Sequence, residues 1–385
     1  MMLARRLLPE LLAGLLVLAC VVPGGGDGAG PGRPVALEPE AGAPAWVAPA
    51  SVIPVPVPGP GPAPGPVPAP DPGPAPSAPE AQPASIPEPL YTYDDLTGDV
   101  QRLAAQHPDL ARLRTLGQTA YGRQIWALGL GTGPAAVLIV GAHHGSEWMT
   151  AQLTATMAED YAQAADADIR EKATVWFIPM LNPDGVTISQ TGLAAFPPEA
   201  HAKLRAWNNG SDDFRGWKAN AEGIDLNRQY PADWAHIVAS PPGPTFSHFK
   251  GDEPLVAPEA RALHDFTLEL NPEIVLAYHS AGRVIYWHFH TWPEHVERDR
   301  RIAEQLAGLT GYALMPPEAN PSGGGYKDWF VQTVGRPGFT QEIGVYTDGG
   351  PLPAEAFAEE WERNRGVGLA MAQEAIRLYE ERGAR

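Results

Sequence analysis

The chain has 385 residues, with 45 Asp and Glu against 27 Lys and Arg, so its formal net charge at pH 7 is −18. This acidic balance argues against a nucleic-acid partner, because binding to phosphates needs clustered basic side chains. The chain has one cysteine, Cys20, which excludes a disulfide framework and thiolate chemistry in the folded part.

The first 22 residues have the pattern of an export signal. A cationic start at residues 5–6 precedes an apolar stretch at residues 7–19, which is too short and too interrupted for a good membrane span. Cys20 follows at a position that resembles the acylation site of bacterial lipoproteins, and the alternative is a plain signal peptide cut nearby. We expect residues 1–22 to be a signal peptide with Cys20 as a candidate lipid anchor. The protein would then be secreted, periplasmic or membrane-anchored on the extracytoplasmic side.

Residues 23–89 are rich in proline, glycine and alanine, and 21 of the 43 prolines of the chain lie between residues 31 and 89. Such a segment favours extended polyproline II structure and cannot bury a core. We expect a disordered spacer here. The remainder, residues 90–385, has a suitable length for one large α/β domain.

Strand-like apolar runs alternate with helical patterns along residues 90–385. The strand-like runs are residues 124–128, 135–140, 174–178, 273–278 and 338–342, and the helical patterns cover residues 150–163, about 296–309 and 353–381. This alternation predicts a single α/β domain with a mixed, mostly parallel, twisted sheet flanked by helices. In such folds we expect sites beyond the carboxyl ends of the strands.

Residues that can bind a metal follow two of these runs. His144 and Glu147, three residues apart, come after the run at 135–140, and His279 comes just after the run at 273–278. Imidazole nitrogen and carboxylate oxygen are ligands of zinc, and a catalytic zinc site needs three protein ligands and an open position. The sequence therefore predicts one Zn²⁺ per chain, bound by His144, Glu147 and His279.

Four other histidines are interpreted as structural. His143 adjoins His144 but lies outside the His-x-x-Glu spacing. His288, His290 and His295 cluster in the sequence and suggest a second metal site, but no carboxylate pairs with them in the sequence pattern. We favour ordinary packing for all four.

Five separated blocks resemble the zinc carboxypeptidases of the carboxypeptidase A type, in that family's order. The blocks are residues 141–148, 181–185, 223–228, 278–280 and 339–344. Within the family, segments 216–220, 278–287 and 324–329 are similar to bacterial γ-D-glutamyl-diamino-acid peptidases, which trim cell-wall peptides. The resemblance implies a zinc-dependent peptidase that acts near a free C-terminal carboxylate.

The same resemblance implies roles for residues around the zinc site. Glu342 matches the catalytic glutamate, which is the general base for a zinc-activated water, and its apolar neighbours predict a raised pKa. Asp225 would accept the second ring N–H of His144 and fix its tautomer. Asn227 and Arg228 match the pair that holds the free carboxylate of the substrate, a task that suits the planar fork of Arg.

Two departures from the family pattern leave assignments open. The family's oxyanion-stabilising arginine follows a tryptophan, whereas here Trp217 is followed by Lys218. Lys218 would act as a point charge, and Arg215 is the alternative. The family's substrate-capping tyrosine would fall near residue 320, and we assign Tyr326 no more than a role in the pocket.

Lys327 falls at the position that lines the family's side-chain pocket. A cation there would favour a second carboxylate, such as that of meso-diaminopimelate or a C-terminal Glu, unless Lys327 points to solvent. We therefore expect a peptide substrate, a muropeptide ending in meso-diaminopimelate. We also expect the protein to be a monomer. The alternatives are a general carboxypeptidase, an amidohydrolase or deacylase on the same scaffold, and an inactive peptide-binding module.

Overall fold

The computed structural model describes residues 90–319 and 321–384. The expected signal peptide with Cys20, and the expected spacer at residues 23–89, lie outside the described residues. Within the described ranges, no helix combines the length and the apolar character needed to cross a membrane.

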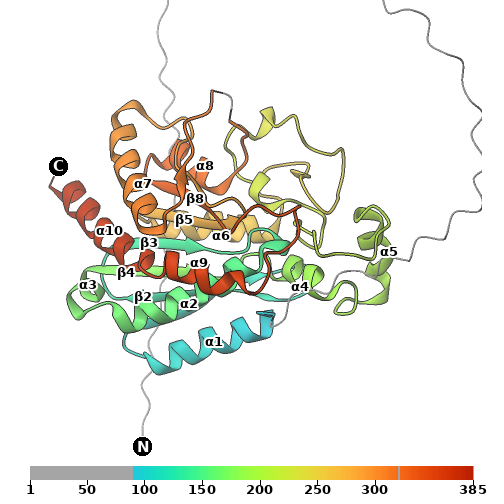
Figure 1. The fold of residues 1–385 in the computed structure, drawn as a ribbon, viewed down its shortest axis with the longest axis horizontal. Helices are drawn as coiled ribbons and strands as arrows, with labels where there is room; N and C mark the ends of the chain where they lie inside the picture. Colours follow the sequence, from blue (N-terminus) through green and yellow to red (C-terminus); the bar gives the residue numbers. More distant parts are fainter. Residues whose placement is uncertain (1–89, 320, 385) are drawn as a thin grey trace, which may run out of the picture. The chain divides into compact units, whose positions relative to one another are not determined.

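One sheet of eight strands runs through the described part of the chain, with helices on both faces (Figure 1). Side by side, the strands are β1 (Ala111–Gln118), β2 (Gln124–Gly131), β4 (Ala173–Ile178), β3 (Ala135–Val140), β5 (Ile274–Ser280), β8 (Gly338–Ile343), β6 (Val284–Tyr286) and β7 (Ala313–Leu314). The central strands β4, β3, β5 and β8 are parallel, whereas the pairs β1–β2, β2–β4 and β6–β8 are antiparallel. The predicted mixed sheet with a parallel centre is therefore confirmed.

Ten α-helices are found in the described residues, and most cover the two faces of the sheet (Figure 1). They are α1 (Tyr93–Gln106), α2 (Met149–Ala164), α3 (Ala167–Lys172), α4 (Pro183–Thr191), α5 (Pro198–Trp207), α6 (Pro258–Leu270), α7 (Val296–Thr310), α8 (Tyr326–Trp329), α9 (Ala356–Asn364) and α10 (Val367–Gly383). Helix α5 packs apart from the sheet in a smaller apolar core. The prediction of one helix over 353–381 is wrong. The chain turns at residues 365–366 between α9 and α10, and glycine at position 366 is a weak helix former.

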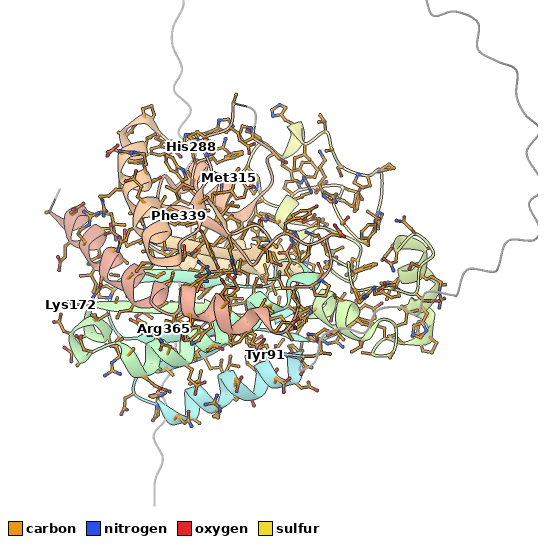
Figure 2. The ribbon with its side chains drawn as sticks, in the orientation of Figure 1. Tyr91, Lys172, His288, Met315, Phe339 and Arg365 are labelled. Carbon is orange, nitrogen blue, oxygen red and sulfur yellow. The ribbon has the colours of Figure 1, made fainter. Side chains whose placement is uncertain are left out.

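Side chains of the central strands alternate between two apolar cores. On β3, Val137 faces the core that contains residues of α1, α2 and α10, whereas Leu138 faces the core that contains residues of α6 and α8. All residues of β3 are buried, as expected for a parallel strand covered on both faces. Figure 2 shows Phe339 of β8 inside the fold and Lys172 at its periphery.

The strand order reverses between β3 and β5. After β3 the chain passes through α2 to β4 on one side, whereas β5 lies on the other side of β3 and β8 follows it outward. The crevice at such a reversal is the usual ligand site of an open α/β sheet. His144 follows β3 and His279 lies near the carboxyl end of β5, so both stand at this crevice.

Candidate metal centre and active site

The three predicted metal ligands meet at the carboxyl ends of β3 and β5. One donor atom from each of His144, Glu147 and His279 lies within 4.8 Å of the others. Nδ1 of His144 is 2.9 Å from Glu147 Oε1, and Nδ1 of His279 is 2.9 Å from Glu147 Oε2. Two imidazole nitrogens and one carboxylate are the donor set of a catalytic zinc site. The triad, which is buried, can hold one metal ion.

A tight turn brings the first two ligands together. His144 precedes a short 3₁₀ helix, η1 (Gly145–Glu147), which folds Glu147 back beside the His144 ring. A Cβ on Gly145 would lie 2.3 Å from the carbonyl oxygen of Gly185, so only glycine fits there. The Gly145 N–H donates to the carbonyl oxygen of Lys218 at 3.0 Å. This close approach ties the ligand turn to the segment that carries Lys218.

Asp225 prepares the His144 ring for a cation. Its Oδ1 lies 3.0 Å from Nε2 of His144, as the sequence predicted. When Nε2 carries the hydrogen that Asp225 accepts, a neutral ring turns the lone pair of Nδ1 toward the Glu147 carboxylate. Two acceptors that face each other fit a positive charge between them. Burial alone would lower the pKa of His144, but the carboxylates of Glu147 and Asp225 raise it to about 9.

Glu342 shares a cavity with the triad. It lies on β8 directly opposite His279 on β5. Strand alternation sends Phe339 and Ile343 into the core and leaves Glu342 on the opposite face, where it lines the cavity that the three ligands also line. Burial raises the pKa of Glu342, an effect that His279 opposes and the Glu147 carboxylate strengthens. The predicted direction of this pKa shift is confirmed.

The structure separates Lys218 from its alternative, Arg215. Nζ of Lys218 donates to Glu147 Oε1 at 3.0 Å, and Lys218 lines the cavity of the triad. The guanidinium of Arg215 instead makes two hydrogen bonds with Asp213, at 2.9 and 2.6 Å, and lines a neighbouring cavity. Of the two cations, only Lys218 stands within reach of the metal ligands.

Asn227 and Arg228 lie in a second short helix, η2 (Leu226–Arg228), close to the triad. Asn227 lines the cavity of the triad and also the adjoining one. Nε of Arg228 is 3.5 Å from Asp225 Oδ2, and its Nη1 donates to Ser322 Oγ at 3.4 Å. Arg228 thus lines neither cavity in this conformation, but it contacts Ser322, which lines the adjoining one.

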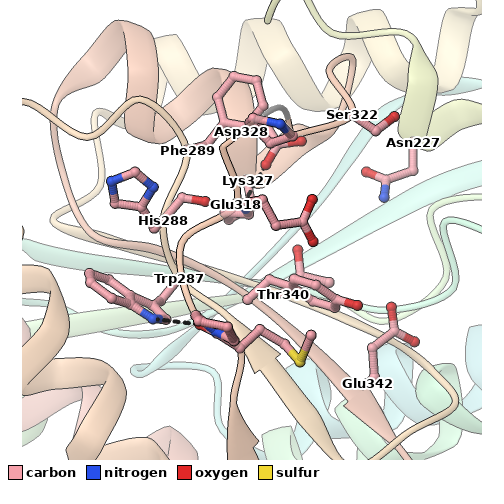
Figure 3. A pocket seen from close by; sticks show the side chains of 14 residues that line it. Asn227, Trp287, His288, Phe289, Glu318, Ser322, Lys327, Asp328, Thr340 and Glu342 are labelled. Atoms are coloured by element: carbon pink, nitrogen blue, oxygen red, sulfur yellow. Dashed lines mark hydrogen bonds and ion pairs between the residues drawn. The ribbon is translucent and has the colours of Figure 1, made fainter. Parts of the chain in front are cut away.

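A second cavity of about 290 Å³ opens beside Glu342 (Figure 3). Lys327 lines it, is buried, donates from Nζ to the carbonyl oxygen of His288 at 3.1 Å and forms an ion pair with Asp328. The alternative in which Lys327 points to solvent is therefore wrong. Its ammonium nitrogen lies over the Phe289 ring, 5.6 Å from the ring centre. His288 and Met315, which are both labelled in Figure 2, also line this cavity.

The expected pocket role of Tyr326 is wrong. Tyr326 is fully buried in the core with α6, and its hydroxyl lies 2.9 Å from Thr267 Oγ1. Two tyrosines that the sequence did not single out, Tyr286 and Tyr346, line the cavity of the triad instead. Tyr286 lies in the segment 278–287 that resembles the γ-D-glutamyl peptidases, so the sequence could have indicated it. Tyr346 is 80% exposed, and no motif in the sequence includes it.

The remaining histidines do not build a second metal site. His143 is fully buried, stacks on a ligand histidine, and has its pKa lowered by burial. His290 does have a carboxylate partner, contrary to expectation, since its Nε2 lies 2.9 Å from Asp233 Oδ2. His295 stacks on Trp292. Within residues 90–319 and 321–384, the triad is the one group of three or more such side chains close enough to hold a metal.

Comparisons with known proteins agree with this geometry. Residues 97–366 match a family model described as zinc carboxypeptidase. The chain is 34% identical over 296 residues to γ-D-glutamyl-L-diamino acid endopeptidase 1 of Lysinibacillus sphaericus, covering 73% of this chain and 72% of that protein. It is 26% identical over 266 residues to carboxypeptidase B of Rattus norvegicus, covering 63% and 60%.

Solved structures show the same fold. Bovine thrombin-activatable fibrinolysis inhibitor, solved with a tick carboxypeptidase inhibitor, aligns with a TM-score of 0.62 at 15% identity, covering 76% of this chain and 98% of that one. Carboxypeptidase A from Helicoverpa armigera aligns with a TM-score of 0.58 at 20% identity, covering 74% and 73%. At these identities the likeness concerns the fold alone.

Proposed function

Since this chain belongs to the zinc carboxypeptidase family and is a zinc metallopeptidase, we propose that it cleaves γ-D-glutamyl bonds to a diamino acid in bacterial cell-wall peptides. The observation that carries the proposal is a single cavity lined by the three metal ligands, Glu342 and Lys218. The relative from Lysinibacillus sphaericus, whose name specifies this bond, supports the substrate class.

The residues of the cavity divide the work of peptide hydrolysis. Bound zinc lowers the pKa of water and polarises a carbonyl. Glu342 is the general base, which takes a proton from the attacking water and returns it to the leaving amine. A raised pKa suits the base role, because a carboxylate with a higher proton affinity takes the proton of the water more readily. Lys218 supplies positive charge where the oxyanion develops.

The adjoining cavity is proposed to hold the residue that is released. Asn227 lines both cavities, so it stands where the free carboxylate of that residue would lie. Arg228 would bind the same carboxylate with its guanidinium fork, once its hydrogen bond to Ser322 is replaced by hydrogen bonds to the substrate. The side chain then enters the cavity lined by Lys327, which favours a second carboxylate.

We also propose that the protein is exported and monomeric, with Cys20 as the lipid anchor. Support for export and the anchor comes from the sequence pattern of residues 1–22 alone. An enzyme that trims cell-wall peptides needs such a location, because its substrate lies outside the cytoplasmic membrane.

The test is incubation of the zinc-loaded protein with γ-D-glutamyl-meso-diaminopimelate peptides, with ordinary α-linked peptides and with N-acyl amino acids, with products identified by mass spectrometry. The proposal expects cleavage of the γ-linked bond at the higher kcat/KM. Glu342→Gln, prepared identically, controls for contaminating peptidases. Exclusive release of α-linked C-terminal residues would establish a general carboxypeptidase instead. Activity confined to N-acyl amino acids would establish a deacylase.

A further inference from the structure

The cavity beside Glu342 carries more negative than positive charge. Its lining contains the carboxylates of Glu318, Asp328 and Glu342, but Lys327 is its one lysine or arginine. When Glu342 is set aside as the general base, two carboxylates and one ammonium group remain. A substrate group that is only an anion is therefore a poor match for the whole cavity.

Lys327 can still bind one carboxylate. An ammonium group has three N–H donors. One is used by the carbonyl oxygen of His288 and one by Asp328. The third is left for a ligand, because the described residues offer it no further hydrogen-bond partner. Since Asp328 already balances its charge, Lys327 acts as a directed donor more than as a free cation.

Glu318 provides the opposite preference. It lies on the segment between β7 and α8, and its carboxylate extends into the cavity near Lys327 and Thr340 (Figure 3). Among the described side chains, no Lys, Arg or His forms an ion pair with it. An uncompensated carboxylate in a partly enclosed cavity attracts a positive charge and repels a negative one.

We infer that this cavity selects a side chain that ends in both an ammonium and a carboxylate group, with Glu318 binding the ammonium and Lys327 the carboxylate. This inference rests on the proposed function, because it concerns the residue released at the same site. A diamino acid such as meso-diaminopimelate carries an ammonium and a carboxylate group on the same carbon, at the far end of its side chain. Lysine lacks the carboxylate, and 2-aminopimelate lacks the ammonium.

The test measures binding of the three free amino acids to the zinc-loaded protein by calorimetry. meso-Diaminopimelate should bind about tenfold more tightly than lysine or 2-aminopimelate, since one charge-assisted hydrogen bond is worth about that factor. Glu318→Gln should remove the advantage of diaminopimelate over 2-aminopimelate. Glu318→Lys should reverse it. Glu294→Gln, at an exposed position outside the cavity, is the matched control and should bind all three like the wild type.

Three results would overturn the inference: tightest binding of 2-aminopimelate by the wild type, equal binding of all three ligands by the wild type, or unchanged binding of all three ligands by Glu318→Gln. Glu318 is exposed, so its replacement leaves the fold intact. Cleavage of γ-D-glutamyl peptides is assayed in parallel. Retained, Glu342-dependent cleavage with unselective binding would sink the inference and leave the proposed function standing. Selective binding without any cleavage would contradict the proposed function and leave the selectivity of the cavity standing.

Discussion

His279 and Glu342 are register partners on the neighbouring parallel strands β5 and β8. A metal ligand and the proposed general base are therefore held at a fixed spacing by one ladder of backbone hydrogen bonds. Both strands are buried over most of their length. This arrangement lets the two side chains keep their relative positions without a loop closing over them. Each side chain can therefore be replaced separately, to measure metal binding for His279 and proton transfer for Glu342.

Removal of one ligand should abolish tight zinc binding. His279→Ala leaves His144 and Glu147, and two protein ligands fall short of the three that catalytic zinc sites use. We expect the zinc content, measured by atomic emission after dialysis, to fall from one per chain to a small fraction. His290→Ala, which removes a histidine paired with Asp233, should keep one zinc. Equal zinc in His279→Ala and wild type would exclude this site.

Glu342→Gln should separate chemistry from metal binding. The amide has nearly the same shape but cannot accept and return a proton. We expect full zinc content and an unchanged melting temperature with kcat reduced about 10²–10⁴-fold. Steady-state kinetics with a γ-D-glutamyl peptide gives the value. A loss below tenfold would count against Glu342 as the general base.

Lys218 and Arg215 should differ sharply when each is replaced by methionine. Lys218→Met removes the charge beside Glu147 and should lower kcat about 10²–10³-fold, the usual cost of losing an oxyanion donor. Arg215→Met should change kcat less than threefold, because the charge of Arg215 is balanced by Asp213. Zinc content is measured for both, because Lys218 also contacts a metal ligand. Equal losses in the two variants would contradict the assignment.

The buried carboxyl of Glu259 should make stability depend on pH. Burial raises its pKa to about 7, although Asn220 donates to Oε2 at 3.0 Å. The unfolded chain ionises this group near pH 4.3, so the folded state binds more protons between about pH 4.3 and 7. The free energy of unfolding therefore falls as pH rises through this window, by roughly 4 kcal/mol from this group.

Glu259→Gln removes that titration. Urea denaturation of both proteins at several pH values should show equal stability near pH 4.5 and a growing advantage of the variant up to about pH 7.5. Zinc loss at low pH affects both proteins alike and cancels in the difference. A difference that is constant across the range would show that Glu259 is ionised throughout.

Much of the sheet and the metal centre could be predicted from local sequence. The run at residues 135–140 is apolar throughout because β3 is covered on both faces, and its end marks the place of His144. Strand β1 escaped notice for the opposite reason. It lies at the edge of the sheet, where Arg112 and Arg114 interrupt the apolar pattern. Helix α1 was also not predicted, because it buries only a narrow stripe of apolar residues.

The specificity residues were harder to predict because their environment comes from distant segments. The family resemblance placed Lys327 in a side-chain pocket, but nothing near it in the sequence indicates that its ammonium group would donate to the carbonyl oxygen of His288. The contribution of Glu318 depends on where the segment after β7 crosses the cavity. Such contacts follow from the tertiary fold, and periodicity along the chain carries no information about them.

One wall of the second cavity, lined by Met315, Pro316, Glu318, Pro321 and Ser322, contains none of the metal ligands and no general base. Backbone hydrogen bonds flank this wall: the Met315 N–H donates to the carbonyl oxygen of Ile285 at its start, and the Gly324 N–H donates to that of Ala232 just after Ser322. Duplicated genes could thus diverge in this stretch alone and acquire new preferences while inheriting the hydrolytic machinery unchanged. Exchange of the stretch between relatives, with both anchors kept, offers a direct route to peptidases of altered selectivity.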